Sequence, residues 1–324
     1  METRILGRLG PVSALTLGGG GIGALWGATT REEGIATLRA APGLGITVLD
    51  AAPGYQVCEE LIGEAFDGRL PSGTLLTTKC GIGNPERGSV LATFRESLHR
   101  SLAAMRVDHV DLFFLHGHIG PPPGAPETAG LGRDLSGYTA WDSYVDEVIP
   151  AFEALVAEGL IRDWGLTGVD VPEAIIAAVG LERRPAAIQA VANLLDSPGS
   201  LTGSAPTPRP RDIIAAAKAA GVGVLGIRAV QAGALTATID RDLEAGHPDA
   251  ADYERAAPYR DLVASWGEDP ALIAHRYALF MPGVDSLILG VKNRDELVAV
   301  VEAAEAGPLD ATQVAAIDAL GLAR

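Results

Sequence analysis

The feature that most constrains the fold is a regular alternation of short apolar runs with longer segments of helical period. Apolar runs of β type occupy residues 13–19, 46–50, 74–79, 110–116, 161–167, 186–191, 222–228 and 285–291. Helical patterns lie near 31–41, 57–67, 88–105, 146–158, 172–179, 211–220, 269–280 and 294–305. Such alternation is typical of βα units around a parallel sheet. Eight units predict an α/β fold, a (β/α)8 TIM barrel, with residues 1–324 forming a single domain.

A doubly wound open sheet is the alternative arrangement of βα units. The barrel is favoured because the eight units fill the chain evenly and no shift in composition marks a second domain. Residues 4–12, before the first strand, are expected to form a hairpin that closes the bottom of the barrel. Long connections at 117–145, 196–210 and 236–262 are expected as βα loops at the C-terminal face, where they would cover a site.

The composition limits the compartment and the partners. A formal net charge of −16 argues against nucleic acid or an anionic membrane as partner, because the mean field repels phosphate. Apolar stretches are too short for a membrane span, and the charged N-terminus does not resemble a secretory signal. With only Cys58 and Cys80 present, a reducing compartment is expected. We therefore expect a cytoplasmic protein with a small-molecule partner, and the sequence carries no signal of an oligomeric state.

Polar side chains stand at the ends of three consecutive predicted strands. Asp50 ends the second strand, Lys79 the third and His116 the fourth, and Tyr55 follows Asp50 in a Gly/Pro turn. Neighbouring strand ends of a barrel converge on one mouth. Each residue alone has an ordinary structural explanation. Asp50 could cap a helix, Tyr55 could pack in the core, Lys79 could lie at the surface and His116 could be a core histidine. Their joint occurrence in this order favours an acid/base site.

The chemistry of these four side chains is complementary. A tyrosine hydroxyl has a pKa of about 10 and is a poor acid near neutrality. An ammonium at roughly 4 Å is worth about 4 kcal/mol at an effective dielectric of about 20, which lowers the pKa of the phenol. Asp50 would hold Lys79 charged and in position. His116 could donate a hydrogen bond that orients a substrate carbonyl.

The motifs LDAAPGY, TTKCG and DLFFLHGH, with Asp50, Tyr55, Lys79 and His116 in this order, resemble the catalytic tetrad of the aldo-keto reductase superfamily. The resemblance extends over most of the chain. It implies a (β/α)8 barrel that reduces an aldehyde or ketone, or carries out the reverse oxidation. The low aromatic content of the loops at 117–145 and 236–262 favours a polar substrate, such as a sugar aldehyde. The resemblance implies that Tyr55 donates the proton, that Lys79 and Asp50 adjust the pKa of Tyr55, and that His116 orients the substrate.

The resemblance also implies a nicotinamide cofactor. The segment LILGVKNRDELVAVVEAA is similar to the one that wraps the adenosine phosphate, with Lys292 at its basic position and Gly290 beside the backbone. Arg294 stands at the predicted helix start, where free N–H groups favour an anion. These residues imply NADPH. Glu296 stands where a glutamine is common, so NADH remains a possible cofactor.

The nicotinamide end of the cofactor is expected at the fifth to seventh strands. Gln189 matches the glutamine that binds the carboxamide, and Thr167 replaces part of a Ser-Asn pair that usually ends the fifth strand. Ile227 and Arg228 end the seventh strand. Arg228 is interpreted either as a phosphate or substrate anchor or as a member of a structural ion pair.

The substrate pocket is the least constrained part of the prediction. Trp26, His118, Tyr138 and Trp141 lie in or near mouth loops and either line the pocket or pack structurally. An alternative function is a redox-sensing regulator that binds NADP with little turnover. The H-x-H of His116 and His118 raises a further alternative, a metal-dependent barrel hydrolase. Because further ligands are missing at the adjacent strand ends, no metal site is expected.

Overall fold

The computed structural model describes residues 1–324 apart from 131–133, 203–207, 245 and 324. Eight parallel strands close into a barrel in the order β10-β3-β4-β5-β6-β7-β8-β9. Their bounds are β3 Leu15–Gly18, β4 Val48–Asp50, β5 Leu75–Cys80, β6 Val110–Leu115, β7 Ile161–Gly168, β8 Ala187–Val191, β9 Gly223–Ile227 and β10 Ser286–Leu289. All eight predicted strands are confirmed, and β10 pairs with both β3 and β9. The sheet is therefore a closed barrel and not an open doubly wound sheet.

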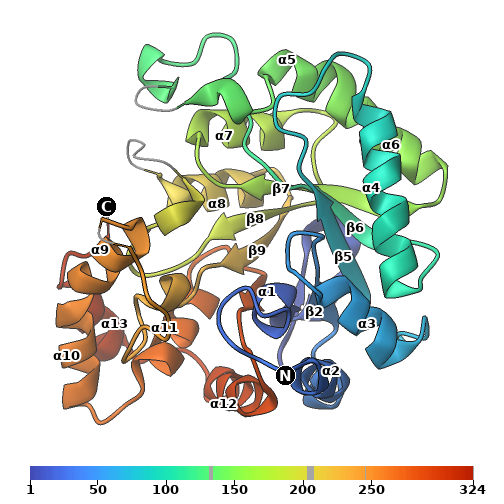
Figure 1. Ribbon diagram of the computed structural model, residues 1–324. Coiled ribbons are helices and arrows are strands. Elements are labelled where there is room, and N and C mark those ends of the chain that lie inside the picture. The colour runs from blue at the N-terminus through green and yellow to red at the C-terminus, as the bar shows by residue number, and fades with distance from the viewer. Residues whose placement is uncertain (131–133, 203–207, 245, 324) are drawn as a thin grey trace.

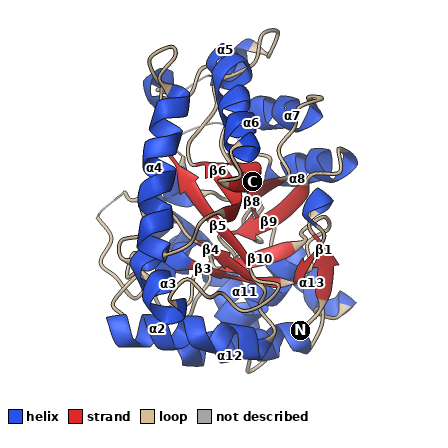
Figure 2. Cartoon of the chain, turned by 90° about the vertical axis from the view of Figure 1, so that its right-hand side faces the viewer, coloured by secondary structure: helices blue, strands red, loops and turns tan. Residues whose placement is uncertain are grey.

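A helix follows each strand and the helices surround the barrel (Figures 1 and 2). They are α2 Arg31–Ala40, α3 Cys58–Phe66, α4 Val90–Met105, α6 Ile149–Ala157, α7 Pro172–Gly180, α8 Pro210–Ala219, α11 Pro270–Leu279 and α12 Arg294–Glu305. Each lies within two or three residues of its predicted position. Among the described residues, no helix is both long and apolar enough to cross a membrane.

The 236–262 connection is not the irregular loop that the sequence predicted. It contains α9 Pro248–Arg255 and α10 Ala257–Ser265. The inner face of α9 carries Asp249 and Asp252, which are buried and paired with Arg228 and Arg255. Because this buried face is charged, the helix lacks the apolar period by which helices are recognised. Helices α1 Gly19–Ile22, α5 Trp141–Ser143 and α13 Ala311–Asp318 were not predicted either.

The N-terminal hairpin closes the lower end of the barrel as expected. Strands β1 Thr3–Ile5 and β2 Pro11–Ser13 pair antiparallel. Between them, Leu6 and Leu9 are buried against the barrel interior, in one cluster with Val48, Leu75, Leu112, Phe114 and Leu225. The Arg8 guanidinium holds the hairpin to β7 through two hydrogen bonds to Asp163, of 2.7 and 2.6 Å.

Side-chain alternation along the strands makes the lower interior mostly apolar, apart from the hydrogen-bonded pair of Thr16 and Ser286, and the upper interior polar. Successive strand residues point to opposite faces of a sheet. In β5, Leu76 packs outward in the core that the helices cover, whereas Leu75 points into the barrel. Two and four residues beyond Leu75, Thr77 and Lys79 point into the upper interior. The same step leads from Val48 to Asp50, so the polar side chains meet at the C-terminal mouth.

Candidate active site

Asp50 and Lys79 form a buried ion pair inside the barrel. Lys79 Nζ lies 2.7 Å from Asp50 Oδ2, and the two side chains are 0% and 2% exposed. The ammonium also donates to the backbone oxygen of Ala51 at 2.8 Å. On the other carboxylate oxygen, Asp50 accepts hydrogen bonds from Thr77 Oγ1 at 2.7 Å and Gln189 Nε2 at 2.6 Å. Burying an ion pair is tolerable when the remaining hydrogen bonds are also satisfied, and these contacts satisfy them.

Tyr55 and His116 complete the predicted group of four. Tyr55 follows β4 in a turn, and the Lys79 ammonium lies 4.5 Å from the centroid of its ring. The His116 ring, directly after β6, meets the Tyr55 ring edge-on at a centroid distance of 5.9 Å. The backbone N–H of His116 donates to the Cys80 oxygen at 2.8 Å, which continues the β5–β6 ladder. The structure therefore brings all four predicted catalytic residues together.

The environment sets the protonation states at neutral pH. Burial opposes the charge of Lys79, but Asp50 and Tyr55 outweigh it and raise its pKa. Burial also raises the pKa of Tyr55, and the Lys79 charge offsets only part of this rise. Lys79 therefore acts on the pKa of Tyr55 in the expected direction, but burial, which the sequence did not indicate, makes the net shift a rise. Burial and the Lys79 charge lower the pKa of His116 to about 4. The site thus holds an ammonium, a neutral phenol and a neutral imidazole.

Sequence reasoning missed two polar residues that support this group. Thr77 donates a hydrogen bond to Asp50 from one layer lower in the barrel. Because Thr77 lies two residues before Lys79 in β5, side-chain alternation predicts that it points to the same side. Glu59 in α3 is buried on the outer side of β5, where its Oε1 accepts a hydrogen bond from Thr78 Oγ1 at 2.6 Å. Burial raises the pKa of Glu59. Glutamate side chains on helices are usually exposed, so no local pattern in the sequence indicates that Glu59 is buried.

The ends of β7, β8 and β9 carry the residues expected at the nicotinamide. Thr167 and Gln189 are register partners of adjacent strands, and Ile227 ends β9. Thr167 Oγ1 donates to the Leu115 oxygen at 3.0 Å. Because Gln189 Nε2 faces Asp50, its Oε1 is directed elsewhere, and among the described residues it receives no hydrogen bond. An amide oxygen free to accept fits the donor NH2 of a nicotinamide carboxamide.

Arg228 is held by the protein itself. Its guanidinium pairs with Asp249 Oδ1 at 3.1 Å, donates to Ser200 Oγ at 3.1 Å and lies 5.7 Å from the centroid of a Trp26 ring. The side chain is 6% exposed, and burial lowers its pKa. Of the two predicted roles, the structure supports the ion-pair member.

Trp26 lies on the side of the expected cofactor rather than with the other predicted substrate residues. A Cβ atom on Gly20 would come within 2.3 Å of Trp26 Nε1, and one on Gly290 would lie 3.8 Å from its Cδ1. Glycine at position 20 is therefore required for this close approach. Gly290 itself is exposed beside β10.

The other three predicted substrate residues divide into two groups. His118 and Tyr138 face each other with ring centroids 5.0 Å apart, and the Tyr138 hydroxyl donates to Asp170, just beyond β7. Asp170, which was not predicted, is buried and has a φ of 76°. Trp141 instead packs on the Tyr144 ring at 5.6 Å. His118, Tyr138 and Asp170 form a polar wall near His116.

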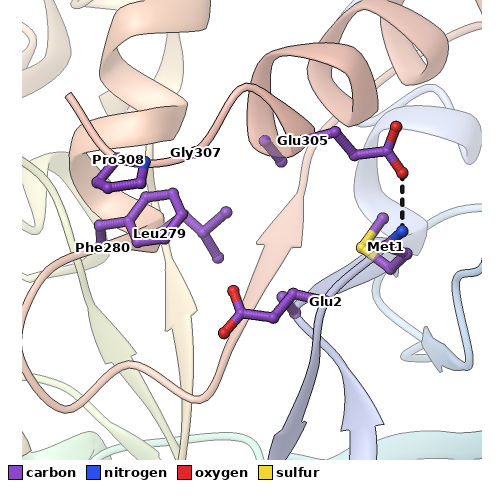
Figure 3. Close-up of a pocket in the computed structure, with 9 residues that line it drawn as sticks. Met1, Glu2, Leu279, Phe280, Glu305, Gly307 and Pro308 are labelled. Atoms are coloured by element: carbon purple, nitrogen blue, oxygen red, sulfur yellow. Dashed lines mark hydrogen bonds and ion pairs between the residues drawn. The ribbon is translucent and has the colours of Figure 1, made fainter.

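Two further features concern metal binding and a cavity away from this group. Within the part of the chain that the structure describes, no group of three or more His, Cys, Asp or Glu could hold a metal ion. A cavity of about 360 Å³ lies near the start of β3, at the barrel end opposite the four candidate catalytic residues (Figure 3). Its polar lining side chains are Glu2 and Glu305, and Glu305 pairs with the Met1 amine at 2.7 Å.

Comparisons with known proteins agree with this geometry. The family model described as "Aldo/keto reductase family" matches residues 14–321. An L-galactose dehydrogenase from Arabidopsis thaliana is 27% identical over 99% of this chain and 94% of its own length. A methylglyoxal reductase, YeaE, from Escherichia coli (strain K12) is 30% identical over 44% of this chain and 42% of its own length.

A solved structure shows the same fold over nearly the whole chain. The holo form of the aldo-keto reductase AKR11C1 from Bacillus halodurans matches with a TM-score of 0.72 and 25% identity, over 99% of this chain and 96% of that one. The family match covers the barrel and all four residues at its mouth. The chain therefore belongs to the aldo/keto reductase family and is an NAD(P)H-dependent oxidoreductase of carbonyl and alcohol groups.

Proposed function

We propose that the protein interconverts a polyhydroxylated aldehyde, such as a sugar aldehyde, and its alcohol, with Tyr55 as the proton donor. The observation that carries the proposal is the buried Asp50–Lys79 pair with its ammonium 4.5 Å from the Tyr55 ring. A buried ion pair costs free energy to desolvate. The pair lies beside the Tyr55 ring, which also contacts the His116 ring. This position fits a role in catalysis.

The four residues divide the chemistry of carbonyl reduction. A bound reduced nicotinamide supplies the hydride. The neutral imidazole of His116 has one N–H to donate to the substrate oxygen, and the Tyr55 phenol donates the proton that this oxygen gains. As Tyr55 loses its proton, the Lys79 ammonium stabilises the phenolate that forms. Donors fixed before the reaction stabilise the developing oxyanion without the cost of reorganisation.

The nicotinamide nucleotide would be held at its ring end by Gln189 and Thr167. Gln189 would accept from the carboxamide while its Nε2 stays on Asp50. Ile227 at the end of β9 would pack beside the ring, and Gly290 would leave room for the nucleotide backbone. Because Gln189 would contact both the nicotinamide and Asp50, binding of the nicotinamide ring would affect the position of Asp50.

The proposed substrate class has two supports. The relative from Arabidopsis thaliana that matches the chain along its length is named an L-galactose dehydrogenase. The wall of His118, Tyr138 and Asp170 brings polar side chains together two residues beyond His116, and His118 is close enough to interact with His116 electrostatically. Hydroxyl groups of a sugar would be recognised by such side chains, because a site built to bond a hydroxyl rejects an analogue without it.

Steady-state oxidation of NADH and NADPH by the purified protein tests the proposal. A panel should pair sugar aldehydes with methylglyoxal and an aliphatic aldehyde of similar size. We expect the highest kcat/KM with a sugar aldehyde. Nucleotide binding without turnover of any carbonyl would contradict the proposal and favour the redox-sensing regulator.

A further inference from the structure

The cation expected at the adenosine phosphate is already paired with carboxylates. Lys292 Nζ contacts Asp240 Oδ2 and lies 3.6 Å from Glu296 Oε1. Asp240 belongs to the connection after β9, so a segment 52 residues away reaches across to Lys292. The Lys292 charge outweighs the effect of burial and lowers the pKa of Asp240, so this carboxylate is ionised at neutral pH.

The second cation of this segment is occupied in the same way. Arg294 donates from Nε to Glu33 Oε1 at 2.9 Å and from its terminal nitrogen to Glu33 Oε2 at 3.0 Å. This two-point contact is the strongest geometry available between a guanidinium and a carboxylate. Arg294 lowers the pKa of Glu33, which is therefore also ionised.

The backbone donors at the start of α12 are taken as well. The N–H of Lys292 donates to Glu296 Oε2 at 2.9 Å, and the N–H of Arg294 donates to Glu33 Oε1 at 2.9 Å. The N–H of Glu296 donates to the side chain of Asn293 at 2.9 Å. A helix N-terminus binds phosphate through its free N–H groups. Here protein side chains, two of them anionic, hold the N–H groups that a phosphate would use.

Asp240, Glu33 and Glu296 therefore already hold Lys292 and Arg294 at the position where the resemblance places the adenosine phosphate, and the Arg241 guanidinium lies 3.7 Å from Asp240 as a further cation. A 2′-phosphate would have to compete with these carboxylates for the same cations and N–H groups. A carboxylate accepts a hydrogen bond from a ribose hydroxyl but not from a phosphate, and acidic residues serve NAD in this way in dinucleotide-binding folds. On the basis of the proposed function, we infer that Asp240, Glu33 and Glu296 make the protein select NAD(H) over NADP(H).

Direct titration of the purified full-length protein with NADH and NADPH tests this selection. Tryptophan fluorescence or calorimetry gives both dissociation constants without any turnover. We expect NADH to bind at least about tenfold more tightly, and Asp240→Asn with Glu296→Gln to tighten NADPH about tenfold. The affinity for NADH should change less than about threefold in that double variant.

Two further variants make the test specific. Glu302→Gln removes one exposed carboxylate from the same helix and should leave both affinities unchanged. Glu33→Gln frees Arg294 by an independent change and should also tighten NADPH. Circular dichroism and a thermal melt show whether each variant is folded.

The outcomes separate the inference from the proposed function. Tighter binding of NADPH by the wild type would overturn the inference and leave the proposed function standing. A preference for NADH that survives both Asp240→Asn with Glu296→Gln and Glu33→Gln would also overturn it, because these carboxylates would not be its source. Binding of neither nucleotide would overturn the proposed function and the inference together.

Discussion

The side-chain amide of Gln189 donates a hydrogen bond of 2.6 Å to Asp50 Oδ1 across the interior of the barrel. The contact joins β8 to β4, which are not neighbours in the sheet. Together with Lys79 and Thr77, it gives Asp50 three side-chain donors. Networks of this kind in a low-dielectric interior are costly when one member is lost. The acid/base group and the expected nicotinamide ligand therefore form one network.

Replacing Lys79 should destabilise the protein as well as inactivate it. Lys79→Met leaves the Asp50 carboxylate buried without its counter-ion, which should lower the free energy of unfolding by about 3–5 kcal/mol. Adding Asp50→Asn removes the unpaired carboxylate charge. The double variant should therefore regain part of the lost free energy of unfolding, without regaining turnover. Urea denaturation measures both effects. An unchanged unfolding midpoint for Lys79→Met would show that the pair is not buried as described.

Removing the Tyr55 hydroxyl should affect turnover but not nucleotide binding. Tyr55→Phe keeps the ring that packs on His116 and Lys79, yet it removes the hydroxyl that we propose as the proton donor. Loss of a general acid typically costs about 10²- to 10⁴-fold in kcat. Steady-state kinetics and a nucleotide titration separate the two effects. Tyr277→Phe, which removes a hydroxyl bonded to Asp318 in the outer layer, is the control and should keep full activity.

His116 should make the stability fall on acidification. Its pKa is lowered from 6.5 to about 4 in the folded protein, so between these values the unfolded chain binds a proton that the folded protein does not. The stabilisation is complete above the unfolded value and is lost as the pH falls toward the folded value, by about 1–3 kcal/mol.

The comparison of wild type with His116→Gln isolates this effect. Urea midpoints from about pH 7 to about pH 5 should fall more steeply for the wild type than for the variant. His275, whose pKa burial also lowers, is present in both proteins and cancels in the difference. Parallel curves would mean that His116 is not buried in its neutral form.

The closure of the barrel bottom should depend on Gly7. Its φ is +49°, and a Cβ atom there would lie 2.6 Å from the Gly223 nitrogen. We expect Gly7→Ala to cost about 2 kcal/mol or more of unfolding free energy. Gly43→Ala, where a Cβ meets no atom within 4 Å, should change it by less than about 0.5 kcal/mol. Equal thermal melts for the two variants would argue against the close approach at Gly7.

The polar wall should discriminate among substrates. Tyr138→Phe removes the hydroxyl that donates to Asp170. For a sugar aldehyde we expect kcat/KM to fall about tenfold or more, because the wall loses a hydroxyl that would bond the hydroxyl groups of such a substrate. Methylglyoxal, which has no chain of hydroxyls, should lose little. Equal losses for both substrates would show that Tyr138 acts on the catalytic group and not on substrate choice.

The barrel and the positions of the four candidate catalytic residues could be predicted because both follow local patterns. Apolar runs separated by amphipathic helices determine the eight units, and their places at strand ends put Asp50, Lys79 and His116 at the mouth of the barrel. The alternation from Leu75 to Lys79 explains why these side chains point inward. Helix α9 could not be predicted in this way, because Asp249 and Asp252 make its buried face charged.

Contacts between distant segments were beyond such reasoning. The pairs Lys292–Asp240 and Gln189–Asp50 join residues that are 52 and 139 positions apart, and no local pattern indicates them. The expectation of NADPH rested on Lys292, Gly290 and Arg294, and no local pattern indicates the carboxylate partners of the two cations. The net direction of the Tyr55 pKa shift was beyond the same reasoning. Burial, which depends on the whole fold, outweighs the single charge that the sequence revealed.

The hairpin that fills the lower barrel also bears on how protons reach the site. Leu6, Leu9 and Phe114 make the lower interior mostly apolar, and the buried hydroxyls of Thr16 and Ser286 at that level are bonded to each other at 2.7 Å. If Tyr55 donates its proton to the substrate, as proposed, the replacement proton is expected to enter from the mouth, by which the product also leaves. A solvent isotope effect on kcat would then report on product release as well as on the chemical step.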